Sequence, residues 1–159
     1  SLPAFFVKKR YKILCKGVIL TALMNGNSYN YRLRFPASPE NIVKVEPFIE
    51  NVRSNISIRE DVYGNMLVVL TEAVNNAILH GNQSNHDKFV DVDVQGDGRG
   101  VSCTIKDEGP GFDYNNLPDP TAPENLEKLT GRGVFLMKQL SDLVIFSEAG
   151  STVEIQFKL

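Results

Sequence analysis

Three segments of the sequence alternate apolar and polar residues at every second position, which is the pattern of β-strands that bury one face. They are residues 29–35 (YNYRLRF), 88–95 (KFVDVDVQ) and 101–107 (VSCTIKD), and the turn sequence GDGRG predicts that the last two form a hairpin. Two further strands are predicted at 143–147 and 152–159, on either side of a turn at EAGS. A sheet of this kind needs a covering layer.

Helices supply that layer. Residues 38–40 (SPE) combine an N-cap, a proline and an acid, and predict a helix that bends at Pro47 or ends just before it. A longer helix is predicted from Ser57, which is spaced from Glu60 as in a capping box, to a left-handed C-cap at Gly81. A short helix follows in GVFLMKQL. Helices on one side of a mixed, mostly antiparallel sheet predict an α+β, two-layer fold.

The chain has 159 residues, the length of one domain, and a formal net charge of -2. This charge gives no basic surface of the kind that binds nucleic acid. Residues 1–23 contain a basic start and an apolar run that is too short to cross a bilayer. We expect the compact domain to span residues 24–159, and residues 1–23 carry no signal that defines their role.

The long helix carries the first chemical signal. Its core face is formed by apolar residues at helical spacing, whereas Glu72, Asn76 and His80 follow at i, i+4 steps on the other side. That side is either solvated or partly covered. No Lys or Arg occurs between residues 59 and 88, which favours the covered alternative, in which a carboxylate and an amide need partners. A metal ion and its phosphates would be such partners. The predicted core residues are Met66, Leu67, Leu70, Ala73, Val74, Ala77 and Ile78, and Val68, Val69 and Leu79 lie among the polar residues.

Asp107 ends an alternating strand on the same face as Cys103 and Ile105, so its carboxylate points toward the core side. A carboxylate there needs hydrogen-bond donors, and the exocyclic amine of a purine is a suitable one. Gly109 and Gly111 have no Cβ and would let the backbone approach a bound ring. The alternative is an acid that begins an ordinary turn.

A third glycine cluster, residues 130–133 (TGRG), precedes the short helix. Backbone N–H groups at the start of a helix bind phosphate readily. The alternative is a loop that ends in a helix cap. Each of the three clusters is weak alone, but their order along the chain favours a common site.

Three motifs together resemble those of the GHKL ATPases, which share the Bergerat nucleotide-binding fold. EAVNNAILHG resembles their N box, DEGPGF their first glycine box and GRGVFLM their second. Within that superfamily, residues 30–159 are most similar to anti-sigma-factor serine/threonine kinases. The resemblance implies a Bergerat-type sandwich with ATP and Mg²⁺ as cofactors.

The resemblance also implies roles for single residues. Asn76 would coordinate magnesium, and Glu72 would be the base that accepts a proton from the attacking hydroxyl. Asp107 would accept a hydrogen bond from the adenine amine, with Gly109 and Gly111 beside it in the base pocket.

Residues 113–130 would form a lid over ATP, closing through the glycines that follow. The resemblance would also place Ser151 near the adenine, at a position where threonine is usual in the family, with Thr152 adjacent. Lys128 or Arg132 would supply the cation at the terminal phosphate. The residues implied on the phosphate side are Lys128, Thr130, Gly131, Arg132 and Gly133.

The expected function is therefore that of an ATP-dependent serine/threonine kinase that phosphorylates a STAS-type antagonist and sequesters a sigma factor. The alternatives are a binding switch that uses ATP without transferring phosphate, and a detached histidine-kinase-like ATPase domain. We expect a cytoplasmic homodimer without direct contacts to nucleic acid or membrane.

Overall fold

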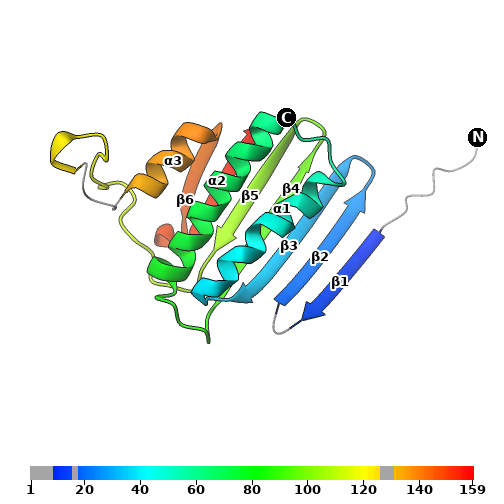
Figure 1. The fold of residues 1–159 in the computed structure, drawn as a ribbon, viewed down its shortest axis with the longest axis horizontal. Helices are drawn as coiled ribbons and strands as arrows, with labels where there is room; N and C mark the ends of the chain where they lie inside the picture. Colours follow the sequence, from blue (N-terminus) through cyan, green and yellow to red (C-terminus); the bar gives the residue numbers. More distant parts are fainter. Residues whose placement is uncertain (1–8, 16–17, 126–130) are drawn as a thin grey trace, which may run out of the picture.

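The structure is a computed structural model that describes residues 9–15, 18–125 and 131–159. Within these residues, seven strands form one sheet in the order β1-β2-β3-β4-β5-β7-β6, and the helices lie on one of its faces (Figure 1). The α+β architecture with helices on one face is confirmed. The strands are β1 Lys9–Cys15, β2 Val18–Asn25, β3 Ser28–Pro36, β4 Phe89–Asp97, β5 Gly100–Lys106, β6 Leu143–Ser147 and β7 Thr152–Lys158.

Every strand pairing among the described residues is antiparallel. β5 and β6 run in the same direction, yet β7 lies between them and pairs with both. The connection through α3 therefore produces no parallel pair. The parallel component of the mixed sheet expected from the sequence is absent from the described strands for this reason.

The sheet extends across the domain boundary predicted at residue 24. β2 spans that residue and pairs with β3, and β1 pairs with β2 at the edge of the sheet. The sequence of this region resembles an apolar run because few polar residues alternate with its apolar ones. Residues 9–15 and 18–23 thus belong to the same sheet as the rest of the chain.

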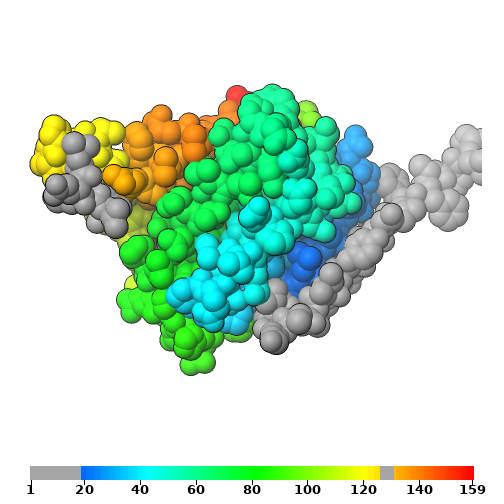
Figure 2. Space-filling model, viewed as in Figure 1, coloured from blue at the N-terminus to red at the C-terminus, as the bar shows by residue number. Residues whose placement is uncertain are grey.

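α1, α2 and α3 form one layer in the space-filling view (Figure 2), and β1 and β2 extend beyond α1 (Figure 1). The α-helices described are α1 Val45–Arg53, α2 Glu60–Asn76 and α3 Arg132–Leu140; a π turn (η2 Ala77–Gly81) extends α2, and the 3-10 turns are η1 Pro39–Lys44, η3 Pro123–Asn125 and η4 Glu148–Gly150.

Two helix boundaries differ from the predicted ones. The helix predicted from residues 38–40 is the 3-10 helix η1, which ends at Lys44, and Pro47 lies in the first turn of α1, which begins at Val45. The capping box at Ser57 is wrong, since α2 begins at Glu60. Ile58 is buried in the core and the chain before α2 is extended, while Arg53 takes the Glu60 carboxylate as an ion-pair partner.

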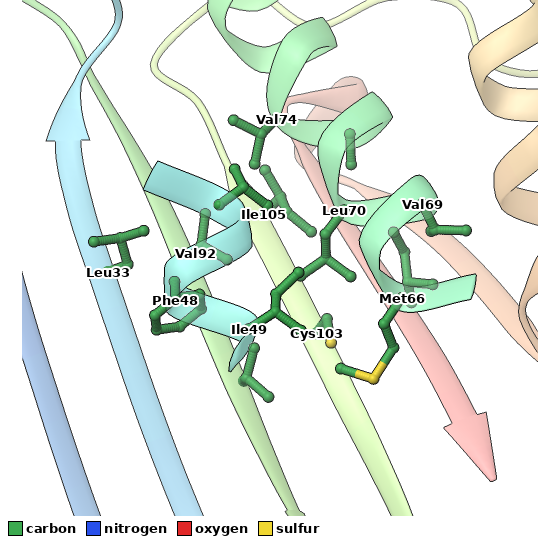
Figure 3. Close-up of a cluster of buried hydrophobic side chains, with 14 of the residues drawn as sticks. Leu33, Phe48, Ile49, Met66, Val69, Leu70, Val74, Val92, Cys103 and Ile105 are labelled. Atoms are coloured by element: carbon green, nitrogen blue, oxygen red, sulfur yellow. The ribbon is translucent and has the colours of Figure 1, made fainter. Parts of the chain in front are cut away.

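The core lies between α1, α2 and the central strands (Figure 3). Leu70 and Val74 of α2 and Ile105 of β5 are almost fully buried there, as the alternation and helical spacing predict. Val69, which the sequence places among polar residues, is also fully buried and points toward α3. α3 therefore covers the part of this side that carries Val69, whereas Val68 and Leu79 are 44% and 39% exposed.

The helical run Glu60–Gly81 has the length and composition of a membrane span, with a mean hydropathy of 1.2 in its best window. The core helix of a soluble domain meets the same criteria. In this fold, 44% of that window is buried inside the molecule.

Replacement of Leu70 by Ala should lower the free energy of unfolding by about 2–5 kcal/mol, because it leaves a cavity between α2 and the sheet. Urea unfolding followed by circular dichroism measures this loss. Val68→Ala is the matched control, since Val68 lies on the same helix with 44% of its surface exposed, and its effect should stay within about 0.5 kcal/mol. Equal losses in the two variants would contradict the assigned packing of α2.

Candidate functional site

A cavity of about 770 Å³ is lined by α2, its π turn, α3 and the ends of β5 and β7. The three motifs, which are far apart in the sequence, meet in it. Gly109 and Thr152 do not line the cavity, and Lys128 and Thr130 lie outside the described residues. The predicted site residues that do line it are Glu72, Asn76, Asp107, Gly111, Gly131, Arg132, Gly133 and Ser151.

Asp107 presents a buried carboxylate to this cavity. Its side chain is only 9% exposed, and its Oδ1 accepts the N–H of Gly109 at 2.7 Å. Oδ2 has no hydrogen-bonding partner among the described residues. Burial raises the pKa of Asp107, against the lowering effects of the Gly109 hydrogen bond and the Lys88 charge. A ligand that brought a hydrogen-bond donor into the cavity would therefore stabilise the Asp107 carboxylate.

Close backbone packing surrounds that carboxylate. A Cβ on Gly81 would lie 2.3 Å from Asp107 Cγ, and one on Gly109 would lie 2.0 Å from the Gly81 carbonyl oxygen. Gly109 thus allows the loop after β5 to approach the end of α2. The predicted left-handed C-cap at Gly81 is wrong, because the left-handed residues are Gln83 and Ser84, after the π turn. Glycine is needed at position 81 because a Cβ would overlap the Asp107 carboxylate.

Gly111 joins the first glycine motif to the turn between β6 and β7. Its φ is +79°, and a Cβ there would lie 1.9 Å from the Ala149 carbonyl oxygen. The same oxygen accepts the N–H of Phe112 at 2.9 Å. One wall of the cavity is therefore two backbone segments in direct contact.

Glu72 and Asn76 lie one helical turn apart on the side of α2 that faces the start of α3. A Cβ on Gly133 would lie 3.0 Å from Glu72 Oε2 and 3.2 Å from the Asn76 amide nitrogen. Within the described residues, no hydrogen bond or ion pair engages either side chain. α3 begins after Gly131, whose φ is +82°, and its first N–H groups have no intrahelical acceptors. Two oxygen-bearing side chains thus lie beside a helix N-terminus, which favours an anion with a cation.

The turn after β6 fixes Ser151. Its hydroxyl donates to the Glu148 carbonyl at 2.9 Å, and its own carbonyl accepts the N–H of Asp107 at 3.0 Å. Thr152 lies outside the cavity and donates to the Glu148 carboxylate at 3.1 Å. Ser151 therefore supports the position of Asp107 through its backbone.

The described part of the predicted lid, residues 113–125, stands out beside α3 (yellow in Figures 1 and 2). It passes close to the start of that helix, where a Cβ on Gly131 would lie 3.0 Å from the Pro118 carbonyl oxygen. Leu117 lines the cavity next to this crossing. The described part of this segment thus borders the end of the cavity that is formed by the start of α3.

Sequence reasoning missed the apolar wall of the cavity. Phe112 and Phe146 pack edge to face at 5.4 Å between ring centroids, and Tyr114 stacks on Phe146 at 5.0 Å. Phe112 ends the first glycine motif, so its apolar character was the available signal. Phe146 occupies a strand position that reads as ordinary core. The apolar side chains that line the cavity include Ile105, Phe112, Leu117, Leu136, Met137, Phe146 and Val153.

Comparisons with known proteins agree with this convergence of motifs. The family model of the histidine kinase-like ATPase domain matches residues 35–157. The chain belongs to this histidine kinase-like ATPase family. Membership confirms the GHKL resemblance and implies the use of ATP.

The curated relatives of this family member include the serine-protein kinase RsbW of Staphylococcus aureus, in strains JH9, Newman and NCTC 8325. Each is 27% identical over 131 residues, a match that covers 77% of this chain and 82% of the relative. The histidine kinase-like domain described here is thus similar to a kinase of serine residues along most of both chains.

Asp107→Asn should make the nucleotide-free protein more stable at neutral pH. The pKa of Asp107 is raised in the folded state, so the unfolded chain loses its proton first as the pH rises above 3.8. The free energy of unfolding of the wild type therefore falls as the pH rises from about 3.8 through the raised pKa of Asp107. The side chain of Asp107→Asn does not ionise, so the variant does not show this fall. Urea unfolding at about pH 4 and pH 7 measures the difference.

Asp119→Asn is the control for this prediction, because a hydrogen bond from Thr121 lowers the pKa of Asp119. It should give no gain in stability at neutral pH. A loss of stability in Asp107→Asn at pH 7 would show that the buried charge is better compensated than the structure indicates.

Proposed function

We propose that this protein is an ATP-dependent serine/threonine protein kinase that acts as an anti-sigma factor. In this proposal it phosphorylates a STAS-type antagonist and sequesters a sigma factor, as a cytoplasmic homodimer. The observation that carries the proposal is that Glu72, Asn76 and Asp107, whose side chains suit a base, a metal ligand and an acceptor for the adenine amine, line one cavity. Similarity to a serine-protein kinase supports a hydroxyl-bearing residue as the group that receives the phosphoryl group.

The nucleotide base fits at the end formed by Asp107 and Gly111. Oδ2 of Asp107 would accept the exocyclic amine, and the apolar wall that includes Phe112 and Phe146 would exclude water from the ring. Because a Cβ on Gly111 would overlap the Ala149 backbone, glycine is needed here for the loop and the turn between β6 and β7 to form one wall of the proposed base pocket.

Magnesium fits the donors at the other end. Asn76 offers an amide oxygen, a hard ligand of the kind that this ion prefers, and Glu72 lies one turn away, where its carboxylate stays available as the base. No cluster of three His, Cys, Asp or Glu side chains occurs among the described residues. Phosphate oxygens of the nucleotide would therefore complete the coordination. Bound there, the ion would neutralise charge on the phosphates.

Glu72 is assigned as the general base. Its carboxylate would take the proton from the acceptor hydroxyl as that oxygen bonds to the γ-phosphorus, and the bond to the β–γ bridging oxygen would break with its electrons leaving on ADP. The first N–H groups of α3, beside Gly133, would hold the phosphoryl oxygens. Arg132 lines the same cavity and is the described candidate for the cation at the terminal phosphate.

Asp107→Asn should weaken the binding of Mg-ATP by roughly 1.5 to 3 kcal/mol, because the amide keeps an acceptor but loses the charge that strengthens the hydrogen bond. Isothermal titration calorimetry measures this loss. The proposed base pocket would be wrong if wild type and variant bound Mg-ATP equally well.

Glu72→Gln should retain the binding of Mg-ATP and lose phosphoryl transfer by at least about 100-fold, because a neutral amide cannot accept the proton. Transfer of ³²P from γ-labelled ATP to a STAS-type protein is the measurement, and acid-stable label identifies a phosphoserine or phosphothreonine. Equal transfer by the variant would refute the role of the base. Acid-labile label would instead favour a histidine-kinase-like activity, and nucleotide-dependent partner binding without any label would favour the binding switch.

A further inference from the structure

Asn82 is completely buried directly after the π turn that ends α2, outside the lining of the cavity. Both ends of its side chain are used. The amide nitrogen donates to the carbonyl of Phe89 at 2.9 Å, and the amide oxygen accepts the N–H of Glu108 at 2.9 Å. A buried Asn satisfied in this way specifies the relative positions of the segments that it joins.

Glu108 closes the arrangement into a ring. The N–H of Phe89 donates to the Glu108 carboxylate, while the Glu108 backbone donates to Asn82 and Asn82 donates back to Phe89. We call these three residues the Asn82 ring. It ties together the end of α2, the start of β4 and the end of β5.

The neighbours of the ring residues are the groups that meet at the base pocket. Gly81 precedes Asn82 and packs against the Asp107 carboxylate, and Asp107 precedes Glu108. This contact is tightly packed, because even a methyl group on Gly81 would overlap the carboxylate. The ring therefore fixes the two segments whose spacing decides where Asp107 Oδ2 points.

We propose that Asn82 and Glu108 are positioning residues for nucleotide recognition, and that the Asn82 ring holds Asp107 where its free oxygen meets the amine of the bound base. The inference rests on the proposed function, since it takes Asp107 as the acceptor of that amine. A hydrogen bond weakens steeply when its angle departs from linear, so a shift of the loop after β5 reduces recognition of the amine before it reduces contact with the rest of the nucleotide.

The test compares the binding of ATP with that of purine riboside triphosphate, which lacks the amine, by calorimetry with Mg²⁺ present. Wild type should prefer ATP by roughly 10- to 100-fold. Glu108→Ala should reduce this preference to about threefold or less, mainly through weaker binding of ATP. Glu108→Gln keeps an oxygen for the Phe89 N–H and should restore at least half of the wild-type preference.

Glu108 is the main residue to replace because it is exposed and its replacement leaves the core intact. Asn82 is buried, so Asn82→Ala is a second variant that is compared once thermal unfolding has verified its folding. Glu46→Ala is the matched control, an exposed glutamate on α1 outside the cavity, and it should keep the wild-type preference.

A uniform loss for both nucleotides in Glu108→Ala would show that the ring only stabilises the fold, and an unchanged preference would show that Asp107 needs no such support. Either result overturns the inference while the proposed function stands. If wild type binds ATP but does not distinguish the two nucleotides, the amine-acceptor role of Asp107 fails and the inference falls with it. Absence of ATP binding by wild type refutes the proposed function itself.

Discussion

The packing of α2 on the sheet is the constraint on which the rest of the structure depends. One side of this helix buries Leu70 and Val74 against the central strands, and that burial sets the rotation of the helix about its axis. Glu72 and Asn76 then necessarily project from another side, toward the first turn of α3. The hydrophobic contact that stabilises the fold is thus also what aims the polar groups of the site.

The site combines features that are unfavourable for a ligand-free protein. Asp107 is buried with one oxygen unsatisfied by the described residues, and Glu148 and Ala149 adopt left-handed φ values of 50° and 56°, which cost energy for residues with a Cβ. Both features are held in place by contacts around the glycine loop, including the Phe112 hydrogen bond to Ala149. The geometry of the pocket therefore lowers the stability of the ligand-free fold, and the shape of the pocket exists before any ligand binds.

Local patterns predicted most of the fold, because alternation and helical spacing report directly on burial. The strands at Tyr31, Cys103 and Ile155 and the core stripe of α2 follow from them. The edge strand β1 and its neighbour β2 did not, since their apolar residues scarcely alternate with polar ones. The start of α2 was missed because Ile58 is buried in the core and Arg59 keeps an extended backbone, a tertiary constraint that local spacing does not encode.

The site was predictable to the extent that its residues belong to motifs. Asp107, Glu72 and Asn76 were identified because their residue types are unusual for their faces. Phe146 and Asn82 were not, because an aromatic residue in a strand and a polar residue after a helix are ordinary until tertiary contacts are known. The role of Gly81 was mispredicted for the same reason. Glycine is required there because a Cβ would overlap the Asp107 carboxylate, which is distant in sequence.

The pairing of β5 with β7 has a further consequence. Lys106 and Thr152 are partners in that pairing, so the segment between them begins and ends at adjacent points of the sheet. The first glycine loop, the predicted lid, α3 and the edge strand β6 all belong to this segment. Insertions or deletions within its surface loop need not alter the spacing of the strands at its base. Lid length and composition can therefore diverge among homologues, or be exchanged by design, on a scaffold that stays the same.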